Sequence, residues 1–504
     1  MTHIGLNITS IRLPDQPAFP EQVQELLATC YLLKNLQKRP SAKAEHSRFL
    51  HCHTLIEGLY QVWATLSHKA RLNVPLSPQF YHSKNHDKIN HLSAEYLKEV
   101  VNALQSLGWA EVIKGGKLPS GEKLVTQIKP AGSLLAAFEK ASIRWSPLGA
   151  QKEVIVLRGY DRDHKERYRV KVPQTSTVRK MAANTRKINE HLRHQAICLH
   201  VSNDRLKQLT VRMAEGKYRS QWHTFQPEKH GRLLNFNHVT LRRIFSRENM
   251  ERGGRFYGGW WQFIPSEYRP YITINGLATV EVDFSELHPR LLYLSQQLDP
   301  SKGDLYDVGL RINGTDYDPS IEPYKTQRAI VKEVFNALLN DETGRYRPSP
   351  SKLKAIDVSY AKLKKLIIKR HPPLKAVLGT GIGLHFQYRD SQIAEKVMLR
   401  LLEKNITCLP VHDSFIVPRH QGRELISAMH EAFATMYGHA AKLKDPSDFK
   451  SDFRLIFKDD KVDLQSMFAR SDDSIHDRYV RSRFATVGAD KSTKWQPRPV
   501  VSIR

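Results

Sequence analysis

The chain has 504 residues and carries 78 Lys and Arg against 51 Asp and Glu, which gives a formal net charge of +27 at pH 7. Its length exceeds that of one ordinary domain, and a hydrophobic content of 40% excludes a chain that is disordered throughout. The excess of positive charge is spread along the sequence and favours a long polyanionic partner, nucleic acid before an anionic membrane surface.

Neither the cysteines nor the N-terminus indicate secretion. The four cysteines lie far apart and form no CxxC pair, so we expect neither a disulfide framework nor a zinc ribbon. The N-terminus lacks the pattern of a signal peptide, and no window approaches the roughly 18 apolar residues that a membrane span needs. The sequence predicts a cytoplasmic, nucleoid-associated protein with no membrane partner, and it identifies no protein partner.

Residues 1–145 are predicted to form a helical region that ends in a winged-helix-like module. Ser93 is a plausible N-cap, and the apolar positions that follow it recur at three- and four-residue steps as far as Gly108. Two short strands, at 109–113 and 124–128, flank a basic loop. This order resembles a winged helix, in which a helix enters a groove and the loop touches phosphate. The predicted loop contacts to nucleic acid are Lys114, Lys117 and Lys123. The alternative is a small domain whose hairpin binds nothing.

Residues 146–250 are predicted to hold a hairpin and basic helices in a thumb-like arrangement. Two β-rich runs at 153–172 surround a charged turn, and Pro173 ends the second run. A polar helix is predicted from Thr177 to about His200, and it carries a series of Lys and Arg. The series fits a solvated helix face, and it fits equally well an element that follows a nucleic-acid backbone.

Residues 251–470 hold the residues that indicate chemistry, whereas 471–504 read as a basic, flexible tail. A strand predicted at 279–284 carries Asp283 next to its last residue, and a hairpin predicted at 405–418 has Asp413 at its tip. If the two strands are neighbours, the carboxylates would repel each other unless cations lay between them. Two divalent ions bridged by such a pair are what in-line phosphoryl transfer uses. Each aspartate alone is equally well explained as a strand-end cap or a turn residue.

Further features in a fixed order resemble the family A polymerases, the group of bacterial DNA polymerase I and, more distantly, the phage-type single-subunit RNA polymerases. Motif A of that family is Asp-Tyr-Ser-Gln-Ile-Glu-Leu-Arg, and residues 283–290 read Asp-Phe-Ser-Glu-Leu-His-Pro-Arg. Motif C is Val-His-Asp-Glu in the DNA enzymes and His-Asp-Ser in the RNA enzymes, and residues 411–414 are similar to both. The resemblance implies an α+β fold with the palm, fingers and thumb of a right-hand polymerase.

The resemblance covers residues 254–418 and implies roles for individual residues. Asp283 and Asp413 would be catalytic and would bind two Mg²⁺ ions, with Mn²⁺ as the alternative and the Phe284 backbone carbonyl as a further ligand. Lys332 would be the general acid for pyrophosphate on a helix whose apolar face is formed by residues 330, 331, 334, 335 and 338. The implied nucleotide contacts are Arg328, Lys332, His288 and Asn336. The implied nucleic-acid contacts are Arg255, Gln262, Gln387, Arg290 and His412.

Departures from the family pattern leave the sugar and the product open. His288 stands where the DNA enzymes have a glutamate that excludes ribose. The first 250 residues hold no set of acids typical of a proofreading exonuclease. The leading interpretation is a template-directed DNA polymerase without proofreading, of the kind that a mobile element carries, acting on a primer-template with dNTPs. The alternatives are a primase-like or single-subunit RNA polymerase that uses NTPs, and a catalytically inactive DNA-binding regulator.

Overall fold

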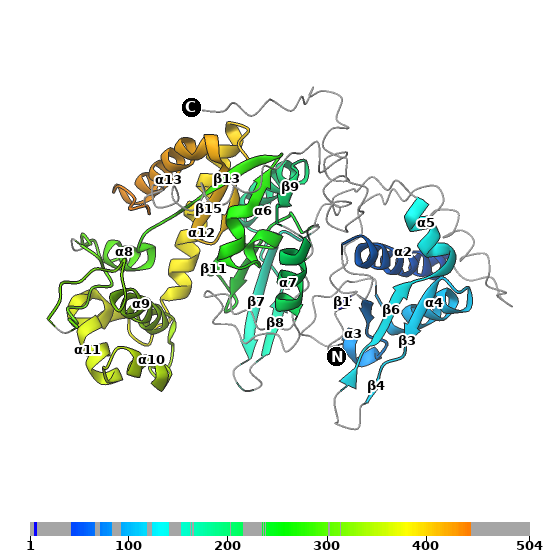
Figure 1. Cartoon of the computed structure of the whole chain (residues 1–504), viewed down its shortest axis with the longest axis horizontal. Coiled ribbons are helices and arrows are strands. Elements are labelled where there is room, and N and C mark those ends of the chain that lie inside the picture. Colours follow the sequence, from blue (N-terminus) through cyan, green and yellow to red (C-terminus); the bar gives the residue numbers. More distant parts are fainter. Residues whose placement is uncertain are drawn as a thin grey trace.

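The structure is a computed structural model that describes most of the chain (Figure 1). The described residues are 5–7, 42–65, 71–82, 92–117, 123–140, 153–161, 163, 166–201, 203–214, 234, 236, 238–300, 303–312 and 314–444. The predicted tail at 471–504 and the last part of the region 251–470 lie outside them. The fold mixes helices and strands, as the predicted α+β class requires. No helix in the described ranges is long and apolar enough to cross a membrane.

The N-terminal part is a helical unit with one four-stranded sheet. Its elements are β1 (Gly5–Asn7), α2 (Ala42–Thr65), β2 (Arg71–Val74), α3 (Pro78–His82), α4 (Ala94–Ser106), β3 (Ala110–Ile113), β4 (Gly116–Lys117), β5 (Lys123–Leu124), β6 (Thr126–Pro130) and α5 (Gly132–Lys140). The strand order is β1-β2-β6-β3, and β4 pairs with β5 as a separate ribbon. A core of its own, formed by leucines of α2 and α4 with Trp109 and Phe138, holds the unit together.

Helix α4 begins and ends where the sequence predicts. The Ser93 side chain caps it by accepting a hydrogen bond from the Tyr96 N–H (3.4 Å), and His51 Nε2 accepts the Ser93 N–H (2.8 Å). The predicted apolar face of this helix is buried. Gly108 lies just past its end with φ of +69°, a left-handed conformation that glycine adopts without strain.

A second four-stranded sheet, in the order β11-β10-β7-β8, follows in the chain. The elements of this part are β7 (Ile155–Asp161), β8 (Glu166–Val170), α6 (Ser176–Arg193), β9 (Ile197–Leu199), α7 (Asn203–Ala214), β10 (Arg242–Ser246) and β11 (Asn249–Tyr257). Strands β7 and β8 form the hairpin predicted at 153–172. Helix α6 is shorter than predicted, because the apolar residues that follow it are buried and pair with the third sheet as strand β9.

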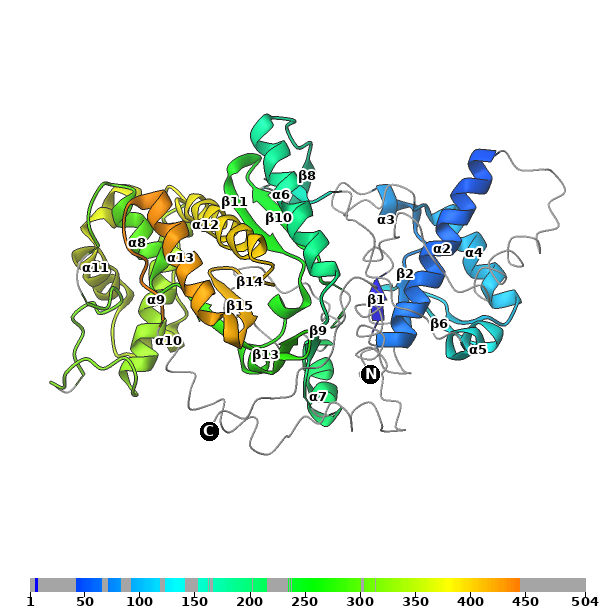
Figure 2. The same ribbon diagram turned by 90° about the horizontal axis from the view of Figure 1, so that it is seen from above.

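The third sheet has five strands in the order β14-β15-β13-β12-β9. The remaining elements are β12 (Ile272–Ile274), β13 (Leu277–Asp283), α8 (Leu287–Leu294), α9 (Tyr324–Asn340), α10 (Pro350–Ala355), α11 (Tyr360–Arg370), α12 (Gly383–Glu403), β14 (Leu409–Val411), β15 (Ser414–Pro418) and α13 (Gly422–Tyr437). Helices α12 and α13 pack against each other (Figure 2), and α8 to α11 gather at one end of the molecule (Figure 1).

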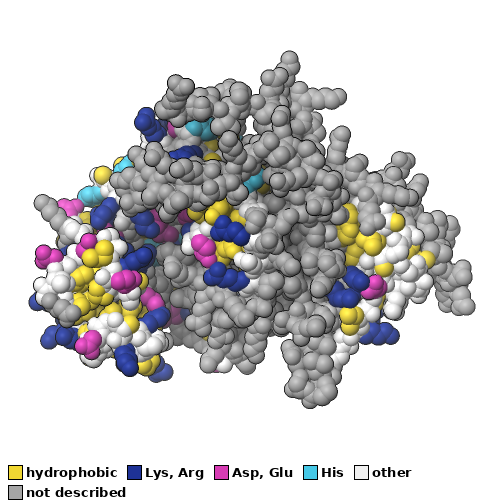
Figure 3. Space-filling model, in the orientation of Figure 1, with side chains coloured by type: hydrophobic (Ala, Val, Ile, Leu, Met, Phe, Trp, Pro, Cys, Tyr) yellow, Lys and Arg dark blue, Asp and Glu magenta, His cyan; other side chains and the backbone are white. Residues whose placement is uncertain are grey.

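One large hydrophobic core joins the last two parts of the chain. It runs from Ile188 on α6 through the third sheet to the helices α9, α12 and α13. The predicted limit at residue 250 falls inside β11, and β9 from the preceding region completes the third sheet. On the face that Figure 3 shows, basic side chains are scattered over the α8–α11 end and are mixed with acidic ones.

Candidate active site

The pairing of β13 with β15 brings the two predicted aspartates together. Asp283 ends β13 and lies opposite Ser414, the first residue of β15. His412 and Asp413 form the two-residue turn between β14 and β15, and His412 has φ of +61°. The Phe284 N–H donates to the Asp413 carbonyl oxygen (3.2 Å). The predicted hairpin is therefore confirmed, and its second strand is the neighbour of the strand that ends at Asp283.

The electrostatics of Asp283 reflect this adjacency. Burial and the negative charge of Asp413 raise the pKa of Asp283 to about 7, although Lys444 and Lys332 oppose the rise. Lys444 Nζ lies 2.7 Å from Asp283 Oδ2, whereas Oδ1 is buried and accepts no hydrogen bond from the described residues. A buried carboxylate oxygen without a donor, beside a second carboxylate, suits a hard divalent cation.

The two aspartates do not form a closed metal site by themselves. Within the described part of the chain, no group of three or more His, Cys, Asp or Glu side chains is placed to hold one metal ion. Ligands beyond Asp283, Asp413 and the Phe284 carbonyl would therefore come from water or from a bound phosphate, which is how Mg²⁺ is often held.

Helix α9 carries the two predicted phosphate-binding cations. Its apolar face is buried at all five predicted positions, and Arg328 and Lys332 lie one turn apart along the edge of that face and not opposite it. Burial lowers the pKa of Lys332, and the charges of Asp413 and Asp283 raise it in opposition. Lys332 therefore lies within electrostatic reach of both aspartates. Arg328 binds Asp304 instead, with Nε 2.6 Å from Oδ2, and its guanidinium lies over the Tyr306 ring.

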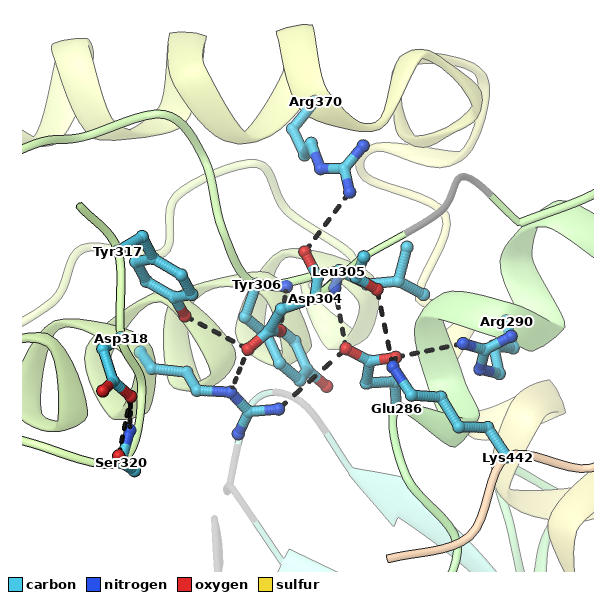
Figure 4. Close-up of polar contacts among 12 residues, drawn as sticks. Glu286, Arg290, Asp304, Leu305, Tyr306, Tyr317, Asp318, Ser320, Arg370 and Lys442 are labelled. Atoms are coloured by element: carbon cyan, nitrogen blue, oxygen red, sulfur yellow. Dashed lines mark hydrogen bonds and ion pairs between the residues drawn. The ribbon is translucent and has the colours of Figure 1, made fainter.

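Glu286, at the fourth position of motif A, is the centre of a polar cluster that the sequence analysis missed (Figure 4). Its side chain is buried, and its φ of +58° places it in a left-handed turn before α8. Oε1 accepts the Leu305 N–H (2.7 Å), while Oε2 accepts from Lys442 Nζ (2.8 Å) and from Arg290 Nη2 (3.1 Å). The predicted nucleic-acid contact Arg290 is thus part of this cluster.

The lysines at 442 and 444 come from a segment that no motif had indicated. Leu443 forms a β-bridge with Phe284, and the Lys444 N–H donates to the Asp283 carbonyl oxygen (2.9 Å). The segment after α13 therefore extends the pairing at the end of motif A and directs one lysine to each motif A acid. The only hint in the sequence is the alternation Lys-Leu-Lys, which is typical of a short strand.

His288 and Arg255 meet at one buried acid on α12. Arg255 Nε donates to Asp390 Oδ2 (2.8 Å), and His288 Nε2 lies 3.2 Å from the same oxygen. Burial lowers the pKa of Arg255, but the charge of the Asp390 carboxylate and its hydrogen bond to the guanidinium raise this pKa by more, so that the net effect is a rise. His288, at the position of the sugar gate, and Arg255, an implied nucleic-acid contact, are therefore held next to each other. Asp390 was not predicted, since a lone acid in an amphipathic helix carries no distinctive signal.

Gln262 supports the β14–β15 hairpin through a hydrogen bond to the backbone of β14. Its Nε2 donates to the carbonyl oxygens of Pro410 (2.9 Å) and Phe256 (3.0 Å), and its Oε1 accepts the Gly258 N–H (2.9 Å). The His412 ring packs edge-on against Tyr257, with ring centroids 5.4 Å apart. Both predicted contacts thus lie beside the aspartate pair.

The remaining predicted contacts lie on α12, on α9 and in the N-terminal unit. Gln387 is half-buried on α12, and Asn336 is half-buried on α9. Lys114 is exposed at the end of β3, whereas the backbones of Lys117 and Lys123 pair with each other in the β4–β5 ribbon. The side chains of these two lysines lie outside the described part of the structure.

A scan of the chain against models of known protein families finds no match, and a search among curated proteins finds none either. The resemblance to family A polymerases therefore rests on the motifs and on the arrangement of their residues.

Proposed function

We propose that the protein is a template-directed DNA polymerase of the family A type, which extends a primer with dNTPs and has no proofreading exonuclease. The observation that carries the proposal is the pairing of β13 with β15, which places Asp283 beside Asp413. Strand-end caps or turn residues have no reason to lie side by side at a cost in repulsion. A shared cation site explains the arrangement.

Two Mg²⁺ ions, or Mn²⁺ in their place, would be held by the two carboxylates with the Phe284 carbonyl. When bound, such ions stabilise the attacking and leaving oxygens of an in-line displacement. The fit rests on the buried Asp283 Oδ1, which accepts no hydrogen bond from the described residues, and on the neighbouring Asp413.

The protein's own residues would bind the nucleotide and move the proton. Lys332 faces both acids and has a pKa lowered by burial, which makes its ammonium a better proton donor to the departing pyrophosphate. Arg328, four residues earlier on the same face of α9, would exchange its Asp304 partner for the triphosphate. His288 would meet the sugar, and Asp390 and Arg255 hold its ring in place.

The other parts of the chain fit this proposal. The third sheet with α12 and α13 would be the palm, and α9 to α11 the fingers. In the N-terminal unit, the order helix, strand, two helices, strand, ribbon, strand and the sheet order β2-β6-β3 support a winged helix. Lys117 and Lys123 of its ribbon, with Lys114 at the end of β3, are the predicted phosphate contacts.

A second candidate, a primase-like or single-subunit RNA polymerase, is favoured by two residues. Ser414 follows the motif C aspartate as in the RNA enzymes, and its hydroxyl is bound to Glu281 Oε1 (2.5 Å). His288 replaces the gate glutamate, and its Nε2 lies 3.2 Å from Asp390 Oδ2.

Primer extension with Mg²⁺ tests both candidates. A labelled primer on a DNA template is incubated with the protein and either dNTPs or NTPs. The variants are Asp283→Asn and Asp413→Asn, and the matched control is Asp357→Asn, which changes an exposed carboxylate between α10 and α11. DNA binding and melting temperature are measured for each variant.

We expect extension with dNTPs by the parent and by the control, and none by the two site variants, which still bind DNA. Extension with NTPs alone would favour the second candidate. Extension that survives in both site variants would show that the aspartate pair is not the catalytic site. Absence of incorporation with either nucleotide set would contradict both proposals.

A further inference from the structure

One face of the second sheet carries a concentration of arginines that the proposed chemistry does not use. Residues that lie opposite each other in paired strands point to the same face, and residues two apart on one strand do so as well. In the register of the strands, Arg158 lies opposite Arg169 and Tyr160 lies opposite Arg167. Arg242 lies opposite Tyr257. Val156 and Ile244 lie opposite each other and are each two residues from an arginine of this set, so all six residues share one face of the sheet. We call it the arginine face.

The opposite face of the same sheet is the one that packs into the protein. Leu157 and Phe245 lie on it and contact Val178 and Met181 of α6 in a small hydrophobic core. Arg167 is exposed, and the other members of the arginine face are half-buried. The arginines thus lie on the side of the sheet away from α6.

Several positively charged side chains lie close together on and beside the arginine face. Desolvation is the main cause that lowers the pKa of Arg167, and the nearby charge of Arg158 lowers it further, so these two guanidinium groups lie close to each other. Arg247, in the turn after β10, adds a further guanidinium 4.5 Å from the centre of the Tyr160 ring. Glu153 forms an ion pair with Arg169, and Glu342 forms one with Arg247.

The arginine face runs directly to the aspartate pair. Tyr257 belongs to the face, and its ring packs against His412, the residue before Asp413. Arg255, two residues before Tyr257, is close enough to Asp413 to feel its charge. A ligand that covers the face therefore extends to the catalytic carboxylates.

We propose that the arginine face binds the phosphate backbone of the nucleic-acid duplex that enters or leaves the aspartate pair. Guanidinium groups bind phosphate oxygens in pairs, and tyrosine rings pack on sugars and bases. Arginines on alternate residues of β8 are about 6.6 Å apart, a spacing that accommodates successive phosphates of one strand. The inference deepens the proposed function and rests on it for the identity of the ligand.

The experiment compares two double variants with the same loss of charge. Arg158→Gln/Arg167→Gln changes the arginine face. Lys180→Gln/Arg186→Gln changes two exposed cations of α6, on the other side of the sheet. Fluorescence anisotropy with a labelled, recessed DNA duplex is recorded in EDTA, so that no synthesis occurs, over a range of salt concentrations. Melting temperatures confirm that both variants fold.

We expect the arginine-face variant to lose about tenfold or more in affinity. The slope of the logarithm of affinity against the logarithm of salt concentration should fall by about two, the amount that two phosphate contacts contribute. The α6 variant should bind within about threefold of the parent. Equal losses in both variants would overturn the proposal, because they would show an effect of net charge alone. A loss confined to the α6 variant would assign backbone binding to that helix instead.

Two further outcomes separate this inference from the proposed function. If the parent extends primers and the arginine-face variant binds DNA normally, the inference fails and the polymerase proposal stands. If no synthesis is found but the arginine-face variant loses DNA binding, the inference stands without the polymerase. Retained duplex binding, with loss of binding to vesicles of anionic phospholipid, would overturn the inference in favour of a membrane surface.

Discussion

At the scale of single residues, the candidate site depends on two acids of motif A that differ in their partners. Asp283 has one lysine and one carboxylate oxygen without a hydrogen bond from the described residues. Glu286, three residues later, is fully engaged by a backbone N–H and two cations. The first arrangement leaves room for a cation, whereas the second fixes the turn between β13 and α8. We infer that Glu286 supports the site and does not bind metal.

Glu286→Gln should therefore destabilise the protein. The amide keeps the volume but removes the charge that Arg290, Lys442 and, at 4.0 Å, Arg328 surround. Breaking a buried ion-pair network by removing one partner costs about 3–5 kcal/mol. Urea unfolding measures the change, with Asp307→Asn as a control, because that residue forms a more exposed pair with Arg311 worth at most about 1 kcal/mol. Similar losses in the two variants would contradict the role of Glu286.

His371 gives a prediction about pH. It is buried between α11 and the site, and its Nε2 lies 2.7 Å from the Leu305 carbonyl oxygen, which fixes that nitrogen as the donor. Burial lowers its pKa to about 4. Between pH 4 and about 6.5 the unfolded state binds more protons, so stability falls as the pH falls through this window. The expected loss is about 3 kcal/mol.

His371→Gln should remove that part of the acid sensitivity. The measurement is the unfolding free energy of parent and variant at pH 7.5 and pH 4.5. His53, whose pKa is also lowered to about 4 by burial, provides a second site, and His53→Gln should remove its own share. If the variant at 371 loses as much stability on acidification as the parent, the assignment is wrong.

Residue-scale prediction from the sequence reached the two aspartates of motifs A and C, but it missed Glu286 within motif A and the residues that lie outside the motifs. Asp283, Asp413 and Lys332 are brought together as expected. Asp390 and Lys444 could not be predicted, because their partners at the site, Arg255 and Asp283, lie more than a hundred residues away in the sequence. Local periodicity carries no information about such contacts.

At the scale of elements, turn and cap signals predicted local structure well, whereas they could not predict the pairing of β9 with a distant strand. The cap at Ser93, the hairpin of β7 with β8 and the apolar face of α9 follow from local rules and are confirmed. The end of α6 was wrong by about seven residues, because strand β9 is defined by its partner β12 and not by its own sequence. Pairing with a distant strand overrode helix propensity there.

Arg243 joins two elements and gives a prediction at this scale. From β10 its fully buried guanidinium donates to the Gly254 carbonyl oxygen (2.9 Å) and, on α12, to Glu395 (2.8 Å) and Ser391 (2.8 Å). A lysine has one nitrogen and cannot reach three acceptors in these directions. We expect Arg243→Lys to cost about 3 kcal/mol or more.

The control for this variant is an arginine on α12, the helix that Arg243 contacts. Arg400 pairs with Glu403 and Glu431 at the surface, so Arg400→Lys should cost less than about 1 kcal/mol. Unfolding in urea measures both changes. Equal effects would show that the attachment of the second sheet to α12 does not depend on the guanidinium geometry.

At the scale of the whole molecule, the described hydrophobic residues divide into separate cores. One lies within the N-terminal unit, and the large one spans the second half of the chain. The length had indicated more than one domain, but it could not show that residues between 188 and 256 share a core with the site. That sharing follows from β9 and from Arg243, and neither has a signal in the sequence.

Separate cores predict two unfolding transitions. Leu104 is fully buried in the N-terminal core and Leu401 in the large one. Truncation of a buried leucine to alanine costs about 2–5 kcal/mol, and that cost falls on the cooperative unit that contains the residue. Leu104→Ala should therefore lower the urea midpoint of residues 42–140 alone, and Leu401→Ala should lower that of residues 238–444 alone.

Pulse-labelling hydrogen exchange with mass spectrometry reads both segments in one sample, so each variant is the control for the other. Protection of amides in α4 reports on the first unit, and protection in α12 reports on the second. If each variant shifts both segments together, the chain is one cooperative unit and the N-terminal part is not an independent module. If the shifts stay separate, the N-terminal unit folds on its own, and its DNA binding can be measured apart from the aspartate pair.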